Sequence, residues 1–202
     1  MAPRIIAQQL SHPSGFLGSV IRFLMNRTNA RLNTFALAKL AVAPEDRVLE
    51  VGFGGGLLLP RLIQRASLVS GLDRSEQAVT AANSRYARAV REGRAEFHVG
   101  AVESLPFNND QFNKAITVNT VYFWKSLAAG FAELNRVLAF DGVVVIGFLP
   151  KEFMDRMNMP KDIFTPRSPE ELVAAMGDAE FKNARIEKPD AATKWSVAMA
   201  TK

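Results

Sequence analysis

The fold of this chain is decided by one stretch, Val48-Leu49-Glu50-Val51-Gly52-Phe53-Gly54-Gly55-Gly56. Its apolar first half predicts a buried strand over Arg47–Val51 that leads into a glycine-rich turn. Glycines let the backbone approach a ligand that any Cβ would keep away. In open α/β sheets such a turn lies at the carboxyl edge, where ligands bind. The stretch therefore predicts a ligand site at the end of the first strand.

Beyond this turn, short β-branched runs alternate with segments of helical pattern. Such alternation predicts βαβ units and a doubly wound sheet that is mostly parallel. Residues 149–167 contain three prolines and three methionines and are predicted to be a long excursion outside the core. The predicted helices cover residues 57–66, 75–91, 126–138 and 168–177. The predicted strands are Arg47–Val51, Ser67–Leu72, Glu96–Val99, Ala115–Val118, Val143–Phe148, Ala184–Glu187 and Trp195–Ala200.

Two details of the turn distinguish between possible ligands. The dinucleotide fingerprint needs a third glycine at position 57, where this chain has Leu57. Glu50 would also repel a pyrophosphate placed beside it. S-adenosylmethionine (SAM) has no phosphate and carries a sulfonium and an ammonium, which suit a carboxylate. A nicotinamide dinucleotide remains the alternative ligand, and Glu50 can also be an ordinary acid at a strand end.

Asp73 ends the second predicted strand, next to the glycine turn in a parallel sheet. A carboxylate at this position can accept hydrogen bonds from both hydroxyls of a ribose. This feature does not separate SAM from a dinucleotide. Asp73 can instead cap the following helix, whose expected N-cap is Ser75.

These stretches together resemble the successive motifs of class I SAM-dependent methyltransferases. The closest branch is that of the ubiquinone/menaquinone C-methyltransferases and the methyltransferase type 11 domain. The resemblance spans about residues 45–148. The matching stretches are Val48–Gly56, Asp73-Arg74-Ser75, Val102-Glu103-Ser104-Leu105-Pro106-Phe107 and Leu134–Gly142.

The resemblance implies a Rossmann-like sheet of seven strands whose last strand is antiparallel, with helices on both faces. It implies SAM as the cofactor, with Asp73 on the ribose and Arg74, Val102 and Glu103 beside the adenine. The residues implied around the methionine part are Glu50, Gly52, Gly54 and Gly56.

The chain departs from the family pattern at two positions. Ala101 replaces a common aspartate that accepts from the adenine amino group, and an alanine cannot do so. Asn113 replaces another common aspartate, whose role is structural. Adenine must therefore be held by backbone groups, or more weakly.

The predicted fourth strand is followed by Asn119-Thr120-Val121-Tyr122-Phe123-Trp124. Asn119 is a candidate contact for the methionine part. Tyr122 can orient an acceptor or hold a cation on its ring, or it can simply pack. His12 is a second weak candidate for catalysis, as a general base, whereas His98 fits an ordinary strand position. Two histidines and no cysteine do not favour a metal site.

The charge of the chain is uneven, with a net charge of +5 and no acidic residue before Glu45. We expect one compact domain in which residues 1–44 form an N-terminal helical lid and residues 45–202 bind SAM. Inside the lid segment, Phe16, Leu17, Val20, Ile21 and Leu24 recur at helical spacing. The basic, apolar lid favours a small, fairly hydrophobic acceptor that can carry a negative charge. The scattered basic residues make nucleic acid an unlikely partner.

The sequence thus predicts a methyltransferase that works by in-line transfer, with alignment and exclusion of water as the protein's contribution. No apolar run reaches about 18 residues, so no transmembrane segment is expected. A cysteine-free chain fits either redox compartment, and the working expectation is a cytoplasmic enzyme. The alternatives are an NAD-dependent oxidoreductase, a SAM-binding relative without methyl transfer (regulatory or cyclase-like), and a methyltransferase of RNA or protein.

Overall fold

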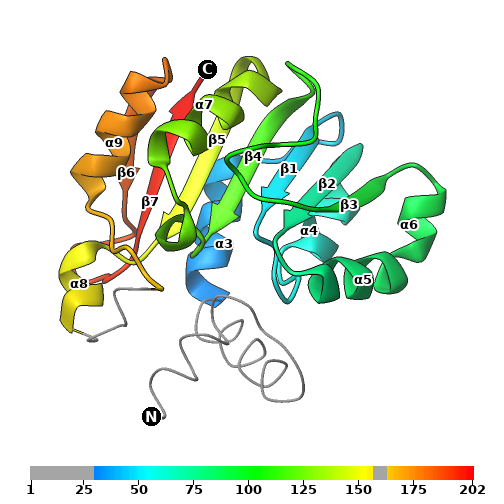
Figure 1. Cartoon of the computed structure of the whole chain (residues 1–202), viewed down its shortest axis with the longest axis horizontal. Helices are drawn as coiled ribbons and strands as arrows, with labels where there is room; N and C mark the ends of the chain where they lie inside the picture. The colour runs from blue at the N-terminus through cyan, green and yellow to red at the C-terminus, as the bar shows by residue number, and fades with distance from the viewer. Residues whose placement is uncertain (1–29, 157–162) are drawn as a thin grey trace.

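A computed structural model describes residues 30–156 and 163–202. Its strands form one seven-stranded sheet in the order β3-β2-β1-β4-β5-β7-β6 (Figure 1). The strands are β1 (Arg47–Val51), β2 (Leu68–Asp73), β3 (Ala95–Val99), β4 (Phe112–Val118), β5 (Leu138–Phe148), β6 (Lys182–Glu187) and β7 (Ser196–Thr201).

The direction of the strands confirms the predicted sheet. β1 pairs in parallel with β2 and β4, β2 with β3, and β4 with β5. β7 is antiparallel to both of its neighbours, β5 and β6. The last strand therefore runs opposite to the other six. The order reverses between β1 and β4, which is the point where open α/β sheets bind ligands.

Helices cover both faces of the sheet, and β1 shows why. Leu49 and Val51 point into one apolar cluster, and Val48 points into the other. A strand buried on both faces needs a helical layer on each. The layer on the Val48 face consists of α3 (Ala30–Leu40), α4 (Leu59–Arg65), α5 (Glu76–Arg85) and α6 (Ala87–Arg91). The opposite face carries the 3-10 turn η1 (Val121–Phe123), α7 (Leu127–Val137), α8 (Lys151–Arg156) and α9 (Pro169–Asp178).

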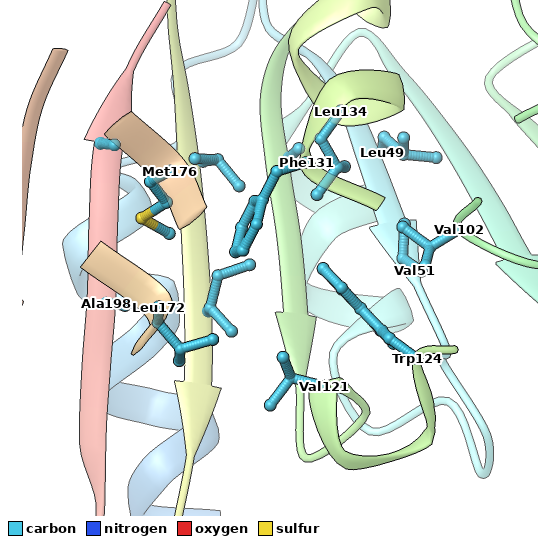
Figure 2. Packing of buried hydrophobic residues seen from close by; sticks show 14 of the residues in the cluster. Leu49, Val51, Val102, Val121, Trp124, Phe131, Leu134, Leu172, Met176 and Ala198 are labelled. Atoms are coloured by element: carbon cyan, nitrogen blue, oxygen red, sulfur yellow. The ribbon is translucent and has the colours of Figure 1, made fainter. Parts of the chain in front are cut away.

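The core under α7 and α9 fixes the end of β4. Figure 2 shows Phe131 and Leu134 of α7 facing the strands, with Leu172 and Met176 of α9 over β5 and β7. Trp124, which follows η1, lies in the same cluster and packs against Phe131 with ring centroids 5.3 Å apart. The loop after β4 is therefore held rigidly against this face.

Serine side chains cap two of the helices, and the cap at Ser75 is the predicted one. The Ser75 hydroxyl accepts a hydrogen bond from the Ala78 amide at the start of α5. Ser168 and Glu171 form a complete capping box at the start of α9. These bonds satisfy amides that have no partner inside the helix.

Three local predictions are wrong. The predicted helix over 75–91 breaks at Tyr86, which ends α5 and precedes α6. The predicted excursion over 149–167 is partly core: it contains α8, and Met154 and Phe164 are only 4% exposed. β5 starts at Leu138, because the predicted turn before it is taken up within the strand, with Asp141 at a φ of 60°.

Of the predicted lid segment, the structure describes residues 30–44. Helix α3 in this segment packs against β4, β5 and β7 on one face of the sheet. Its residues Leu32, Ala36 and Leu40 are at most 2% exposed. The other residues of the predicted lid, including His12, lie outside the described residues. No helix in the described part of the chain is long and apolar enough to cross a membrane.

Candidate functional site

The glycine turn after β1 is shaped by close packing on one side and open space on the other. Gly52 has a φ of +71°, and a Cβ there would overlap the side chain of Thr120 after β4. Gly54 has a φ of +50°, and a Cβ there would meet nothing within 4 Å. Both positions favour glycine for their backbone conformation. The turn therefore joins β1 closely to β4 and leaves its middle open to a ligand, while Gly56 leads into α4.

Glu50 is the most unusual side chain of the site. It lies beside Gly71 of β2 and Ile116 of β4 and is only 5% exposed. Its Oε2 atom has no hydrogen-bond partner among the described residues. Burial raises the pKa of Glu50 to about 8, and the charge of Asp73 adds to the rise. A buried carboxylate is costly unless it is paired, so this position favours a positively charged ligand.

Asp73 connects the glycine turn to the start of α5. Its Oδ2 atom accepts a hydrogen bond of 2.7 Å from the Gly54 amide, and its Oδ1 atom accepts one of 2.9 Å from the Ser75 amide. The carboxylate is thereby held at the carboxyl edge of β2. A carboxylate can accept about four hydrogen bonds, so the geometry is compatible with both roles predicted for Asp73, the helix cap and the ribose contact.

The loops after β2, β3 and β4 are joined across the same edge. The Arg74 guanidinium donates to the Phe123 carbonyl over 3.3 Å. The Oε1 atom of Glu103 accepts from the Lys125 amide over 2.6 Å. Val102 is 3% exposed and belongs to the core that contains Trp124. These implied adenine neighbours thus come from adjacent loops at one edge of the sheet.

Ala101 forms part of a short turn before this region. Its carbonyl accepts a hydrogen bond of 3.1 Å from the Ser104 amide. The turn holds Val102 and Glu103 at the end of β3. Ala101 offers no side-chain acceptor, as the sequence indicates, so the polar groups near this position are backbone atoms or belong to neighbours.

Asn119 and Tyr122 form a hydrogen-bonded pair at the ends of β4 and β5. Asn119 has a φ of 58°, and its amide donates to the Gly147 carbonyl over 2.8 Å. The Tyr122 hydroxyl donates to the Asn119 side chain over 3.1 Å and accepts from the Leu149 amide. Tyr122 is 5% exposed, and burial raises its pKa above the ordinary value. This geometry favours a packing role for Tyr122 over proton transfer.

Trp124 and His98 also make their contacts within the protein. The Trp124 indole donates to the Thr120 hydroxyl over 3.2 Å. His98 lies on the edge strand β3, with Nε2 3.3 Å from Glu96, and its ring packs edge-on against Phe107. In the described ranges, no group of three or more His, Cys, Asp or Glu side chains could hold a metal ion.

A cavity of about 330 Å³ lies between the glycine turn and α5. Sequence reasoning missed its aromatic wall residue Tyr86, because the residue stood inside a predicted helix. The hydroxyl of Tyr86 is buried and has no hydrogen-bond partner among the described residues. The cavity is lined by Phe53, Gly54, Gly55, Gly56, Leu59, Gln77, Ala78, Ala81, Ala82, Arg85 and Tyr86.

Comparisons with known proteins agree with this arrangement. The model of a family described as "Methyltransferase domain" matches residues 49–146 of this chain. The "Uncharacterized methyltransferase YdaC" of Bacillus subtilis is 29% identical over 132 residues, which cover 64% of this chain and 71% of YdaC. The "Ubiquinone/menaquinone biosynthesis C-methyltransferase UbiE" of Geotalea daltonii is 29% identical over 134 residues, covering 65% of this chain and 56% of UbiE.

A solved structure from Thermotoga maritima shows the same fold. It is described as a "SAM-dependent methyltransferase, possible histamine N-methyltransferase" and has 22% sequence identity to this chain. The two structures superpose with a TM-score of 0.68, covering 92% of this chain and 95% of the other.

Proposed function

This chain is a class I SAM-dependent methyltransferase, and we propose that its glycine-turn edge binds SAM and presents the methyl group to a small, fairly hydrophobic acceptor. The observation that carries the proposal is Glu50, whose buried Oε2 atom lacks a partner below the turn. SAM brings two positive charges, whereas the pyrophosphate of a dinucleotide would bring negative charge to the same place.

Each part of the cofactor has a counterpart along this edge. Glu50 and the turn glycines Gly52, Gly54 and Gly56 would hold the cationic methionine part, and the ionised carboxylate would attract its positive charge. Asp73 accepts from the ribose hydroxyls, in a position set by its hydrogen bonds to Gly54 and Ser75. Bound SAM supplies an electrophilic methyl group on its sulfonium.

The adenine side of the site is built from adjacent loops. Val102 provides an apolar neighbour, Arg74 and Glu103 flank the ring, and Asn119 lies toward the methionine part. Arg74 and Glu103 are held by hydrogen bonds to the loop after β4. Because Ala101 has no acceptor, adenine selectivity rests on backbone groups in this proposal.

The protein contributes alignment and exclusion of water to in-line transfer. The rigid loop after β4 forms one wall at the expected methyl position, with Trp124 fixed to Thr120. The geometry of Tyr122 does not favour a general base and His12 lies outside the described residues, so we assign none. A hydrophobic acceptor is supported by the relative named for ubiquinone/menaquinone biosynthesis.

The predicted lid over residues 1–44 remains part of the proposal. Deleting residues 1–29 keeps α3, which packs on the sheet. The shortened chain should bind SAM within a few-fold of the full chain but transfer no methyl group, because closure positions the acceptor and excludes water. Transfer at the full-length rate by a folded, shortened chain would contradict the lid.

The function as a whole is tested in two steps. Calorimetric titration with SAM and with NAD should show binding of SAM alone. Incubation with methyl-labelled SAM and a panel of small metabolites, including quinones and organic acids, should then label at least one of them. Binding of SAM with no labelled product, from small molecules or from added RNA and protein, would favour the second candidate, a SAM-binding relative without transfer, for which Ala101 is the specific observation.

A further inference from the structure

Tyr86 occupies the break between α5 and α6. At this residue the backbone leaves the helical region, with φ at −108° and ψ at 24°. The Tyr86 ring lies 5.9 Å from the ring of Phe97 in β3, and Phe97 lies 5.6 Å from Phe53 of the glycine turn. A chain of aromatic contacts thus connects the helix break to the turn that carries the proposed cofactor.

Glu50 lies on the same face of the sheet as this aromatic chain. It pairs with Gly71 in β2, and Gly71 pairs with Phe97 in β3. A Cβ on Gly71 would come within 2.7 Å of Phe97 and 2.9 Å of Phe53. The missing side chain at Gly71 therefore lets the aromatic rings lie beside the Glu50 carboxyl, which explains its strong burial.

Two buried polar atoms lack partners in this region. They are Oε2 of Glu50 and the hydroxyl of Tyr86. Native proteins rarely keep such groups unpaired, and each one calls for an explanation. Both groups lie beside the glycine turn, and Tyr86 also lines the cavity between the turn and α5.

The charges around Tyr86 indicate how the two groups are coupled. Burial raises the pKa of Tyr86, the charge of Arg85 lowers it, and the charge of Glu50 raises it further. The pKa of Glu50 is raised by burial and by Asp73. Glu50 and Tyr86 therefore interact electrostatically across an apolar region, with Asp73 and Arg85 as the other charged neighbours.

We propose that Tyr86 is a positioning residue, whose hydroxyl stabilises the ionised form of Glu50 when the cationic part of SAM is bound. Without a ligand, Glu50 keeps its proton near neutral pH and the hydroxyl has no charged acceptor. When a cation binds, Glu50 releases its proton to solvent and becomes a strong acceptor for the Tyr86 hydroxyl. The cavity and the helix break give the ring room to make the small movement that this bond requires.

This inference rests on the proposed function, because it needs SAM as the cation. It accounts for both unpaired groups at once. They are unpaired in the free protein because the hydrogen bond between them forms only in the bound state. If Tyr86 instead has only a packing role, its ring is sufficient and its hydroxyl is irrelevant to binding.

The test is the double-mutant cycle of Tyr86→Phe and Glu50→Gln, with SAM affinity measured by calorimetry between pH 6.5 and 8.5. The phenylalanine keeps the ring against Phe97 and removes the hydroxyl alone. We expect Tyr86→Phe to weaken SAM binding by about tenfold at pH 7. The factor should be similar across this pH range, because the hydrogen bond that is lost forms only in the bound state and the pKa of Glu50 in the free protein does not depend on it.

The Glu50→Gln background is the control. There, Tyr86→Phe should change SAM affinity by less than twofold, because the charge that the hydroxyl stabilises is absent. The melting temperature of free Tyr86→Phe should equal or exceed that of the wild type, since an unpaired buried hydroxyl is removed.

Two results would overturn the inference. One is unchanged SAM affinity in Tyr86→Phe at every pH measured. The other is an equal loss of affinity in both Glu50 backgrounds, which would mean that the hydroxyl acts independently of the carboxylate. Failure of the wild type itself to bind SAM would overturn the proposed function and this inference together, and is readily distinguished from the other two results.

Discussion

Around the glycine turn, the buried Oε2 atom of Glu50 and the buried hydroxyl of Tyr86 lack partners within the described residues, whereas the buried hydroxyl of Tyr122 after β4 is fully paired. Glu50 and Tyr86 represent the first region. Tyr122, bonded to Asn119 and Leu149, represents the second. The difference indicates that the first region binds a ligand and that the second has a structural role. The groups around the glycine turn are left for a charged ligand, whereas the bonds of Tyr122 to Asn119 and Leu149 fix the loop after β4.

The comparison predicts its largest effect at Asp73, which belongs to the ligand-binding region. Asp73→Ala should weaken SAM binding by about 10- to 100-fold, the usual value of charge-assisted hydrogen bonds of about 1.5–3 kcal/mol. Calorimetry on the purified variant measures this loss. Circular dichroism must show a folded protein, and unchanged affinity in that folded protein would contradict the assignment of Asp73 to the ribose.

Tyr122→Phe should lower the stability of the protein and leave its SAM affinity nearly unchanged. Removing its hydroxyl leaves the Leu149 amide and the Asn119 side chain without their partner. We expect a loss of about 1–2 kcal/mol in the free energy of unfolding, with SAM affinity changed by less than threefold. Urea denaturation and calorimetry measure the two quantities. If SAM affinity falls much more than stability, Tyr122 belongs to the ligand-binding region and does not serve only to fix the loop after β4.

The smallest of the mutational effects is expected at Ala101. Ala101→Asp should tighten SAM binding by about threefold to tenfold, because it supplies an acceptor for the adenine amino group. A competition titration against the wild type can resolve such a gain. Weaker binding in a folded variant would show that the loop around residue 101 holds adenine in another way.

The sequence could predict most of the sheet because each strand is locally encoded. The apolar runs of β1 and β5 and the glycine turn are sufficient to place the site at the switch between β1 and β4. The serine caps at Ser75 and Ser168 are equally local, since each bonds an amide within its own first turn.

Features that depend on distant contacts were missed. The helix break at Tyr86 is not marked by any glycine or proline between residues 75 and 91, and it is accompanied by packing against Phe97. The prolines around Met154 and Phe164 predict an excursion outside the core, yet tertiary packing buries both residues. The sequence placed a carboxylate at the end of β1, but its raised pKa follows from burial that only the folded chain creates.

The central claim, that the buried Glu50 receives the cation of SAM, is tested most directly by the pH dependence of SAM binding. Glu50 has a pKa of about 8 in the free protein and must lose its proton to pair with a cation. Its contribution to affinity is therefore complete only well above pH 8 and is lost as the pH falls through that value.

Isothermal titration of the wild type at pH 6.5 and pH 8, in two buffers of different ionisation enthalpy, measures both affinity and proton release. We expect SAM to bind about 15-fold more tightly at pH 8 than at pH 6.5, and about one proton to be released at pH 6.5. In Glu50→Gln both effects should disappear. Equal affinity at the two pH values with no proton release in the wild type would contradict the account.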